Sequence, residues 1–440
     1  MSDSKLSSSR LSLIWFGAAL SIAEIMTGTY FAPLGFSDGL LAIIIGHVIG
    51  CLLLFGAGLI GAREHMSSMQ TVSTVFGNGG MKLFSILNVL QLIGWTGIMI
   101  YDGALGAVEL WNLPFTAWTF IIGALIIVWL FIGIRNMGYI NSIMGYGLGI
   151  LCIYLLISLL QESSIHSQGI ITDEMTFTAA LELSIAMPLS WLPLISDYTR
   201  LSKNPVAGTA ASAIVYGITS SVMYVLGLAA ALYTNESNIA KVLLHAGLGF
   251  GGLIIIVFST VTTTFMDALS AGISSESLQT KYSGRTIGII VTVIGTIGAS
   301  IYPMDNIIPF LYMIGSVFAP MIAILLTHYF LLRHYPHLDH GPNLYIICWA
   351  SGTYMYHQFL DSNPFLGASL STIVGTALAT IATAYIISLI SKKKKESLFK
   401  ELVDILDLAI REGGSTISDY VHADGGEGNM QNFHQIYGKK

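Results

Sequence analysis

Charged residues are scarce in this chain of 440 residues. Asp, Glu, Lys and Arg make up 10% of it and hydrophobic residues 54%, whereas ordinary soluble domains are about 25% charged. A soluble domain of this length needs far more polar groups to cover its surface. Cysteine is also rare, and Cys51, Cys152 and Cys348 lie inside apolar runs without a paired spacing. The position of the cysteines argues against a disulfide framework or a cysteine metal site. The shortage of charged residues favours an integral membrane protein.

The apolar residues form continuous runs rather than alternating patterns. A hydrocarbon core of about 30 Å takes about 20 helical residues to cross, and these runs are long enough. Because the runs do not alternate, they predict helices and not a β-barrel. We expect an all-α membrane protein of about twelve spans, near residues 11–34, 39–61, 82–108, 114–133, 137–160, 176–197, 206–232, 248–275, 286–303, 306–332, 343–360 and 364–390.

Basic residues are concentrated in alternate loops between these spans. Basic loops stay in the cytoplasm, so this asymmetry predicts that both chain ends are cytoplasmic and that residues 161–175 face outward. We therefore expect a multi-pass protein of the cell's inner membrane, in contact with membrane lipids. Its parts are a cytoplasmic N-terminus (1–10), a transmembrane domain (11–390) and an acidic cytoplasmic tail (391–440).

Two of the expected spans contain helix-breaking residues. The first reads SIAEIMTGTYFAPLG, with Gly28, Pro33 and Gly35, and the sixth reads AMPLSWLPL, with Pro188 and Pro193. Proline removes a backbone donor and clashes with the preceding turn, so we expect both helices to bend or unwind there. Paired interruptions point to the binding site of an inverted-repeat transporter if the repeat has five helices. The alternative is that Pro and Gly are simply common in membrane helices.

Aromatic and polar residues share one face of the third span. Trp95, Met99 and Asp102 follow one another at helical spacing, and Trp191 lies in the interruption of the sixth span. Two indoles on facing helices offer flat surfaces that would hold a planar heterocycle. Ordinary helix packing, or anchoring at the membrane surface, is the alternative reading of both tryptophans.

Carboxyl groups inside the spans are the next candidates. Glu24, Asp102 and Asp267 lie within apolar runs, and a charge at the centre of a membrane costs about 2.5–3.5 kcal/mol on insertion scales. Glu24 lies beside the expected break of the first span, where a carboxylate would accept hydrogen bonds from ring N–H or amino groups, or hold a proton. The alternative is a structural pair, or a neutral acid bonded to the backbone.

Three consecutive threonines, Thr262 to Thr264, occupy the eighth span. Their hydroxyls suit a sodium ion, which transporters of this kind coordinate with carbonyls freed by helix unwinding. The equally weighted alternative is that each hydroxyl bonds a carbonyl of its own helix.

These features together resemble the nucleobase-cation-symport-1 family over about residues 10–390. The more specific pieces are Gly94–Trp95, the stretch SDYTR at 196–200, and GSVFAPMIAILLTHYFLLR in the tenth span, with Pro320 and Arg333. The resemblance implies the leucine-transporter fold, with two inverted five-helix repeats plus two further helices.

The resemblance also implies roles for single residues. Trp95 and Trp191 match the aromatic pair that sandwiches the substrate in the family. Thr262 and Thr263 match the hydroxyls of a sodium site, which would face the backbone carbonyls of the first span near Ala23 and Met26. Met99 departs from the family pattern, because it stands where members often have an amide side chain. In the eighth span, Thr264 or Asp267 stands near a position where members often have asparagine.

The chain is most similar to the hydroxymethylpyrimidine transporters linked to thiamine salvage. This similarity implies a secondary active symporter that imports a pyrimidine-like base, with sodium or a proton as the coupling ion and with no cofactor. The alternatives are a cytosine, purine or allantoin permease, or an amino-acid transporter of the same fold. We expect no enzymatic activity, because the sequence contains no nucleotide-binding loop, metal cluster or nucleophile–base pair.

The tail beyond the four lysines at 392–395 has a different composition. Residues 396–440 contain eight acids and four bases, and LFKELVDILDLAI has apolar residues at helical spacing. The following stretch, with GGST, DY, MQN and YGK in order, resembles a fragment of formamidopyrimidine-DNA glycosylases just before their zinc finger. The remainder of that enzyme is missing, and a duplex-binding face needs positive charge. We therefore expect an appended fragment that binds no nucleic acid.

Overall fold

The computed structural model describes residues 5–161, 175–234, 241, 249–304, 306–334 and 342–411. Nearly all of the expected outer loop 161–175 and the glycosylase-like end of the tail lie outside the described residues. The described part is helical, apart from one isolated bridge between Leu6 and Ser202. Its elements are α1 (Ser8–Ala19), α2 (Ile22–Thr29), η1 (Ala32–Leu34), α3 (Gly35–Glu64), α4 (Ser68–Leu110), α5 (Phe115–Gln161), α6 (Phe177–Ser190), α7 (Ile195–Thr199), α8 (Pro205–Thr234), α10 (Gly249–Glu276), α11 (Gly284–Ile301), α12 (Ile308–Phe330), η2 (Leu332–His334), α13 (Pro342–Ser362) and α14 (Gly367–Arg411).

Within the described residues, nine stretches are long and apolar enough to cross a membrane. The expected count of twelve therefore stays a prediction. One difference concerns the fourth and fifth expected spans, which the structure joins in the single helix α5 of 47 residues. The turn expected at Asn136 is helical, because a lone Asn only weakly disfavours helix.

The chain divides into two compact units. The first comprises Met1–His334 and Gly341–Thr380, and the second comprises Tyr335–His340 and Ile381–Lys440. Of the second unit the structure describes the helical stretch 381–411, the C-terminal part of α14. This stretch includes the helix that the sequence predicts at LFKELVDILDLAI.

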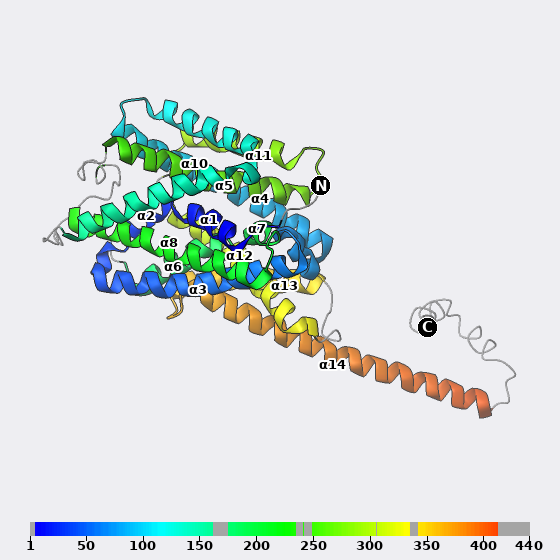
Figure 1. The fold of residues 1–440 in the computed structure, drawn as a ribbon. Coiled ribbons are helices and arrows are strands. Elements are labelled where there is room, and N and C mark those ends of the chain that lie inside the picture. The colour runs from blue at the N-terminus through cyan, green and yellow to red at the C-terminus, as the bar shows by residue number, and fades with distance from the viewer. Residues whose placement is uncertain are drawn as a thin grey trace. The chain divides into compact units, whose positions relative to one another are not determined.

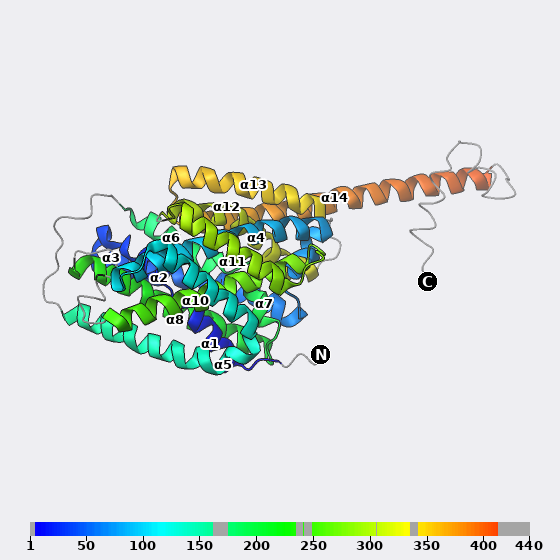
Figure 2. The ribbon, with the colours of Figure 1, turned by 90° about the horizontal axis from the view of Figure 1, so that it is seen from above.

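The core of the first unit is built around α1. This helix packs against α8, α5 and α10, while α3 packs on α6 and α8, and α4 packs on α10 and α11. Figure 1 shows α1 in dark blue among these helices, and Figure 2 shows the same arrangement from above. Leu11 and Trp15 of α1 have no exposed surface. The interior of this unit is therefore filled by side chains from several helices around one short central helix.

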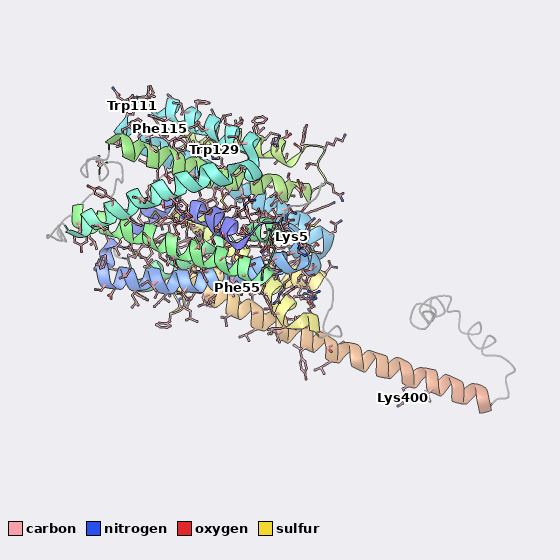
Figure 3. All side chains as sticks on the ribbon, in the orientation of Figure 1. Lys5, Phe55, Trp111, Phe115, Trp129 and Lys400 are labelled. Carbon is pink, nitrogen blue, oxygen red and sulfur yellow. The ribbon has the colours of Figure 1, made fainter. Side chains whose placement is uncertain are left out.

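Large apolar side chains also cover the outside of the first unit. Leu52 is 67% exposed, Ile218 63% and Phe131 60%. Trp111 and Phe115 lie close together at the turn between α4 and α5, with Trp129 further along α5 (Figure 3). Exposed apolar surface of this extent on long helices fits a hydrocarbon environment and not water.

The interruption of the first span lies earlier than predicted. The helix breaks at Leu20 and Ser21, between α1 and α2. The Ser21 side chain accepts a hydrogen bond from the Glu24 backbone N–H at 3.2 Å. This is the N-cap arrangement that starts a new helix. Pro33 instead lies in η1 and Gly35 at the start of α3, so these residues turn the chain into the second span.

Gly28 has a packing role rather than a helix-breaking one. A Cβ atom at Gly28 would lie 2.1 Å from the Tyr224 backbone oxygen, and one at Gly227 would lie 1.8 Å from that of Ile25. Only glycine at both positions lets the α2 and α8 backbones approach so closely. Glu24 of α2 is thereby held against the side chains of α8.

Candidate substrate-binding site

The interruption predicted in the sixth span is present in the structure. Helix α6 ends at Ser190 and α7 begins at Ile195, with a turn between them. Two amide side chains of α4 support the free carbonyls of this segment. Gln91 Nε2 donates to the Ser190 oxygen at 3.2 Å, and Asn88 Nδ2 donates to the Pro193 oxygen at 3.4 Å. Asn88 and Gln91 are polar residues at helical spacing on the same face of α4 as Trp95. The sequence prediction missed this signal.

A small cavity lies where the interruptions of the two spans meet. Its volume is about 20 Å³, room for about one water molecule. Residues from both interruptions and from α4 and α10 line it: Ser21, Ala23, Glu24, Trp95, Met99, Met187, Ser190, Trp191, Thr263 and Asp267. A planar heterocycle is much larger than this, so the lining side chains must move apart to admit one.

Most of the residues that the sequence singles out come together here. Both tryptophans, Met99, Glu24 and Asp267 line the cavity, although they come from α2, α4, α10 and the turn after α6. Asp102 is buried, with 4% exposure, but it is not among the lining residues. The roles of all these side chains in binding remain predictions, and the structure adds only their proximity.

Each candidate indole contacts further aromatic rings. Trp191 lies edge-on to Trp15, with 5.5 Å between ring centroids, and 6.1 Å from Tyr216. Trp95 lies edge-on to Phe310 at 5.4 Å. Edge-to-face pairs of this kind stabilise a defined ring position. The sequence prediction missed Trp15, Tyr216 and Phe310, because single aromatic residues in an apolar span do not stand out from its packing residues.

The Glu24 carboxyl group is buried beside the cavity, with 1% exposure. Its Oε1 accepts a hydrogen bond from the Tyr216 hydroxyl at 2.9 Å. Its Oε2 is buried and has no hydrogen-bond partner among the described residues. A carboxyl oxygen in this position is suited to accept a hydrogen bond from a ligand N–H group.

The threonines of α10 differ in what they contact. The Thr263 hydroxyl lies 3.3 Å from both the Gly17 and Ala18 backbone oxygens of α1. Thr262 instead bonds carbonyls of its own helix, those of Phe258 at 2.8 Å and Ser259 at 3.0 Å. Thr263 therefore joins α10 to the end of α1.

The carbonyls expected to face the threonines of α10 each accept a hydrogen bond within α2. Those of Ala23 and Met26 accept hydrogen bonds from Thr27 and Thr29, each at 2.7 Å. The reason is the position of the break, because the carbonyls left free are those of the last turn of α1. The expected role of Ala23 and Met26 stays a prediction, and the described contacts of Thr263 across to α1 are with Gly17 and Ala18.

Long apolar helices, two interrupted spans and a cavity between the interruptions define a multi-pass membrane transporter. The sequence profile described as "Permease for cytosine/purines, uracil, thiamine, allantoin" matches residues 5–399. The chain belongs to this permease family, which confirms the resemblance to the nucleobase-cation-symport-1 transporters. It is accordingly a transporter and not an enzyme.

Individual relatives are distant in sequence and close in fold. The cytosine permease of Escherichia coli strain K12 is 22% identical over 332 residues, which span 74% of this chain and 79% of that protein. The structure resembles that of Mhp1, a nucleobase-cation-symport-1 family transporter in a closed conformation with bromovinylhydantoin bound. That likeness has a TM-score of 0.73 at 18% identity and covers 88% of this chain and 94% of that one. A Na⁺-coupled sialic acid symporter follows, with a TM-score of 0.66 at 14% identity over 87% and 90% of the two chains.

The tail has a separate relative. Fifty residues are 44% identical to formamidopyrimidine-DNA glycosylase of Psychromonas ingrahamii, which is 11% of this chain and 18% of that enzyme. The predicted resemblance of the tail to a fragment of this enzyme is thus confirmed, and the match leaves most of the glycosylase without a counterpart.

Proposed function

We propose that this protein is a cation symporter that imports a planar base carrying an exocyclic amino group, with hydroxymethylpyrimidine as the preferred substrate. The observation that carries the proposal is the cavity lined by Trp95, Trp191 and the Glu24 carboxyl group. Two indoles offer flat surfaces for a heterocycle. Oε2 of Glu24, which has no hydrogen-bond partner among the described residues, is an acceptor for the amino group. Cytosine, the substrate named for the Escherichia coli relative, has the same amino group and is the second candidate.

The two carboxyl groups disfavour the amino-acid alternative. Glu24 and Asp267 both line the cavity, and neither is a donor for a substrate carboxylate when ionised. A buried anion beside either group would be repelled unless a proton were also bound. An aminopyrimidine meets no such conflict.

Equilibrium binding to the purified full chain tests this function. Radiolabelled hydroxymethylpyrimidine, cytosine and uracil would be compared, with uracil as the ring that lacks the amino group. We expect both amino-bearing rings to bind at least about tenfold more tightly than uracil, since a lost hydrogen bond to a charged group is worth about 1.5–3 kcal/mol. Glu24→Gln should reduce the difference in affinity between the amino-bearing rings and uracil. Equal binding of all three rings, or of none, would contradict the proposal.

We further propose that the coupling ion is sodium, held between Thr263 and the end of α1. The Thr263 hydroxyl and the carbonyls of Gly17 and Ala18 supply neutral oxygen atoms within a short distance of each other. Thr262 is a matched control, since its hydroxyl bonds only its own helix among the described contacts. Thr263→Val should reduce the effect of sodium on base binding, because coupled ligands change each other's affinity by the same factor. Thr262→Val should preserve it.

If base uptake by the wild-type protein is independent of sodium and is driven by a pH gradient, the sodium site is excluded.

We also propose an orientation in the inner membrane with both chain ends in the cytoplasm. It is supported by the basic residues of the alternate loops, such as Lys203 and Arg285.

A further inference from the structure

A groove lined by basic side chains lies at the start of the first span. Its volume is about 470 Å³, which is within the usual range for small-molecule sites. Four residues line it: Lys5, Ser7, Arg10 and Lys203. Three of the four are cationic, and none is acidic. The groove shares no residue with the cavity between the interrupted spans, so it is a separate candidate site.

Backbone hydrogen bonds hold the two sides of this groove together. The Leu6 N–H donates to the Leu201 oxygen at 2.6 Å, and the Lys203 N–H donates to the Leu6 oxygen at 2.9 Å. The Leu6 side chain is only 7% exposed. Because side chains of an extended segment alternate, a buried Leu6 leaves its neighbours Lys5 and Ser7 together on the outer face. The backbone pairing therefore brings Lys5 and Lys203 to one groove.

The three cations of the groove lack an anionic partner within the part of the chain that the structure describes. None of them forms an ion pair with a described residue, and all three are exposed. Like charges on paired segments repel one another and destabilise the pairing. A bound anion would remove this repulsion between the N-terminal segment and the turn that contains Lys203.

The donors of the groove suit a phosphate group. The Arg10 guanidinium offers a planar fork of N–H donors that matches phosphate oxygens, and a lysine ammonium adds a point charge. Ser7 is the N-cap of α1, and its oxygen accepts a hydrogen bond from the Arg10 backbone N–H at 3.4 Å. Its own hydroxyl proton is therefore available to a ligand oxygen. The positive end of the α1 dipole lies at the same place.

The position of the groove favours a lipid as the source of this phosphate. Arg10 is in the first turn of α1 and directly precedes Leu11, which has no exposed surface and begins the expected first span. Basic residues beside a span attract anionic headgroups, and basic pockets between membrane helices bind them. A zwitterionic headgroup carries its own cation, which the remaining basic side chains would repel.

We propose that this groove binds the phosphate group of an anionic phospholipid and thereby joins the first span to the sixth. Lys5, Ser7 and Arg10 lie at the start of the first span, whereas Lys203 follows α7, the second half of the sixth. A headgroup in contact with both sides stabilises the pairing of these two segments. The site does not depend on which base is transported, so it goes beyond the proposed function.

Lipid binding to the purified full chain in detergent tests the site. Native mass spectrometry would count bound molecules of phosphatidylglycerol, which is anionic, and of phosphatidylcholine, which is zwitterionic. The variants are Lys5→Gln, Arg10→Gln and Lys203→Gln. Lys281→Gln is the matched control, because this exposed lysine lies in the α10–α11 turn, on the same proposed side of the membrane, and does not line the groove. All four changes are at exposed positions, so the fold should be retained.

We expect the wild type to bind phosphatidylglycerol at least about fivefold more tightly than phosphatidylcholine. Each groove variant should lose about fivefold in affinity for phosphatidylglycerol, as expected for one basic residue at a membrane surface, whereas Lys281→Gln should bind like wild type. Phosphatidylglycerol should also raise the unfolding temperature of the wild type more than that of Lys203→Gln, because a ligand that binds the folded state stabilises it.

Three results would overturn the proposal. Equal binding of the two lipids would exclude recognition of the anionic headgroup. An equal loss of affinity in Lys203→Gln and Lys281→Gln would mean that these lysines act only as a diffuse surface charge. Displacement of phosphatidylglycerol by an equal concentration of inorganic phosphate would assign the groove to free phosphate and not to a lipid. No transported base enters these measurements, so they are independent of the proposed function.

Discussion

Trp95 and Trp191 line one cavity but belong to different elements, helix α4 and the turn that follows α6. Each is positioned by an edge-on ring, Phe310 for the former and Trp15 for the latter. If both indoles stack on the substrate, Trp95→Ala and Trp191→Ala should each weaken binding by about 1–3 kcal/mol, the usual range for base–aromatic stacking. Equilibrium binding of the amino-bearing base measures this loss.

A tryptophan outside the cavity provides the control for these variants. Trp111 is 53% exposed and is not among the cavity-lining residues, so Trp111→Ala should bind the base like wild type. Replacement of either cavity indole by phenylalanine should restore part of the lost affinity, because a flat ring is retained. Unchanged affinity in both alanine variants would mean that the indoles serve packing alone.

Single residues differ in how visible their roles are in the sequence. Glu24 and Asp267 stand out because ionisable groups are costly inside a membrane, and both line the cavity. His47 of α3 and Ser220 of α8 are also buried, and their side chains lie 2.6 Å apart, but this contact depends on which faces of the two helices meet. That information lies in the packing of the helices and not in the local pattern.

At the level of the helices, most positions follow from the apolar runs, and the irregular segments do not. The break in the sixth span follows from Pro188 and Pro193. The break in the first span contains no proline, and its signal is a weaker one, Ser21 three residues before Glu24, the spacing of a capping box. The stronger Gly and Pro signals around Pro33 belong to the turn into α3. A prediction from Gly and Pro residues alone therefore placed this break too late in the chain.

Close packing of α2 on α8 depends on Gly227. A Cβ atom there would lie 1.8 Å from the Ile25 backbone oxygen, and backbone cannot yield as a flexible side chain does. We expect Gly227→Ala to destabilise the protein by about 1–3 kcal/mol or more, as overpacking does. The displacement of α2 should also weaken base binding, since Glu24 lies on that helix. Thermal unfolding in detergent, together with the binding assay, measures both effects.

Gly79 of α4 is the matched control, because a Cβ atom there meets nothing within 4 Å. Gly79→Ala should leave stability unchanged or raise it slightly, since alanine favours helix over glycine by about 1 kcal/mol. Equal unfolding temperatures for the Gly227 and Gly79 variants would contradict the packing role.

At the scale of the whole molecule, the proposed orientation places the α4–α5 turn outside the cell and the α10–α11 turn inside. Asn112 and Ser283 are exposed residues in these two turns. An impermeant thiol reagent applied to intact cells should label Asn112→Cys and leave Ser283→Cys unlabelled until the membrane is opened. The native cysteines are buried or half-buried, so unaltered protein serves as the background control. Labelling of Ser283→Cys in intact cells would reverse the orientation.

Removal of residues 396–440 should leave transport largely intact. Every deleted residue belongs to the second compact unit, whereas the interrupted spans and the cavity residues belong to the first. The glycosylase match covers only 18% of that enzyme, and the tail has no cysteine for a zinc finger. We therefore expect base uptake by the truncated protein to match that of the full chain at equal membrane levels, and neither protein to incise a duplex that contains an oxidised purine. Lost uptake would assign the tail a regulatory role, and incision by the full chain would show that the fragment retains activity.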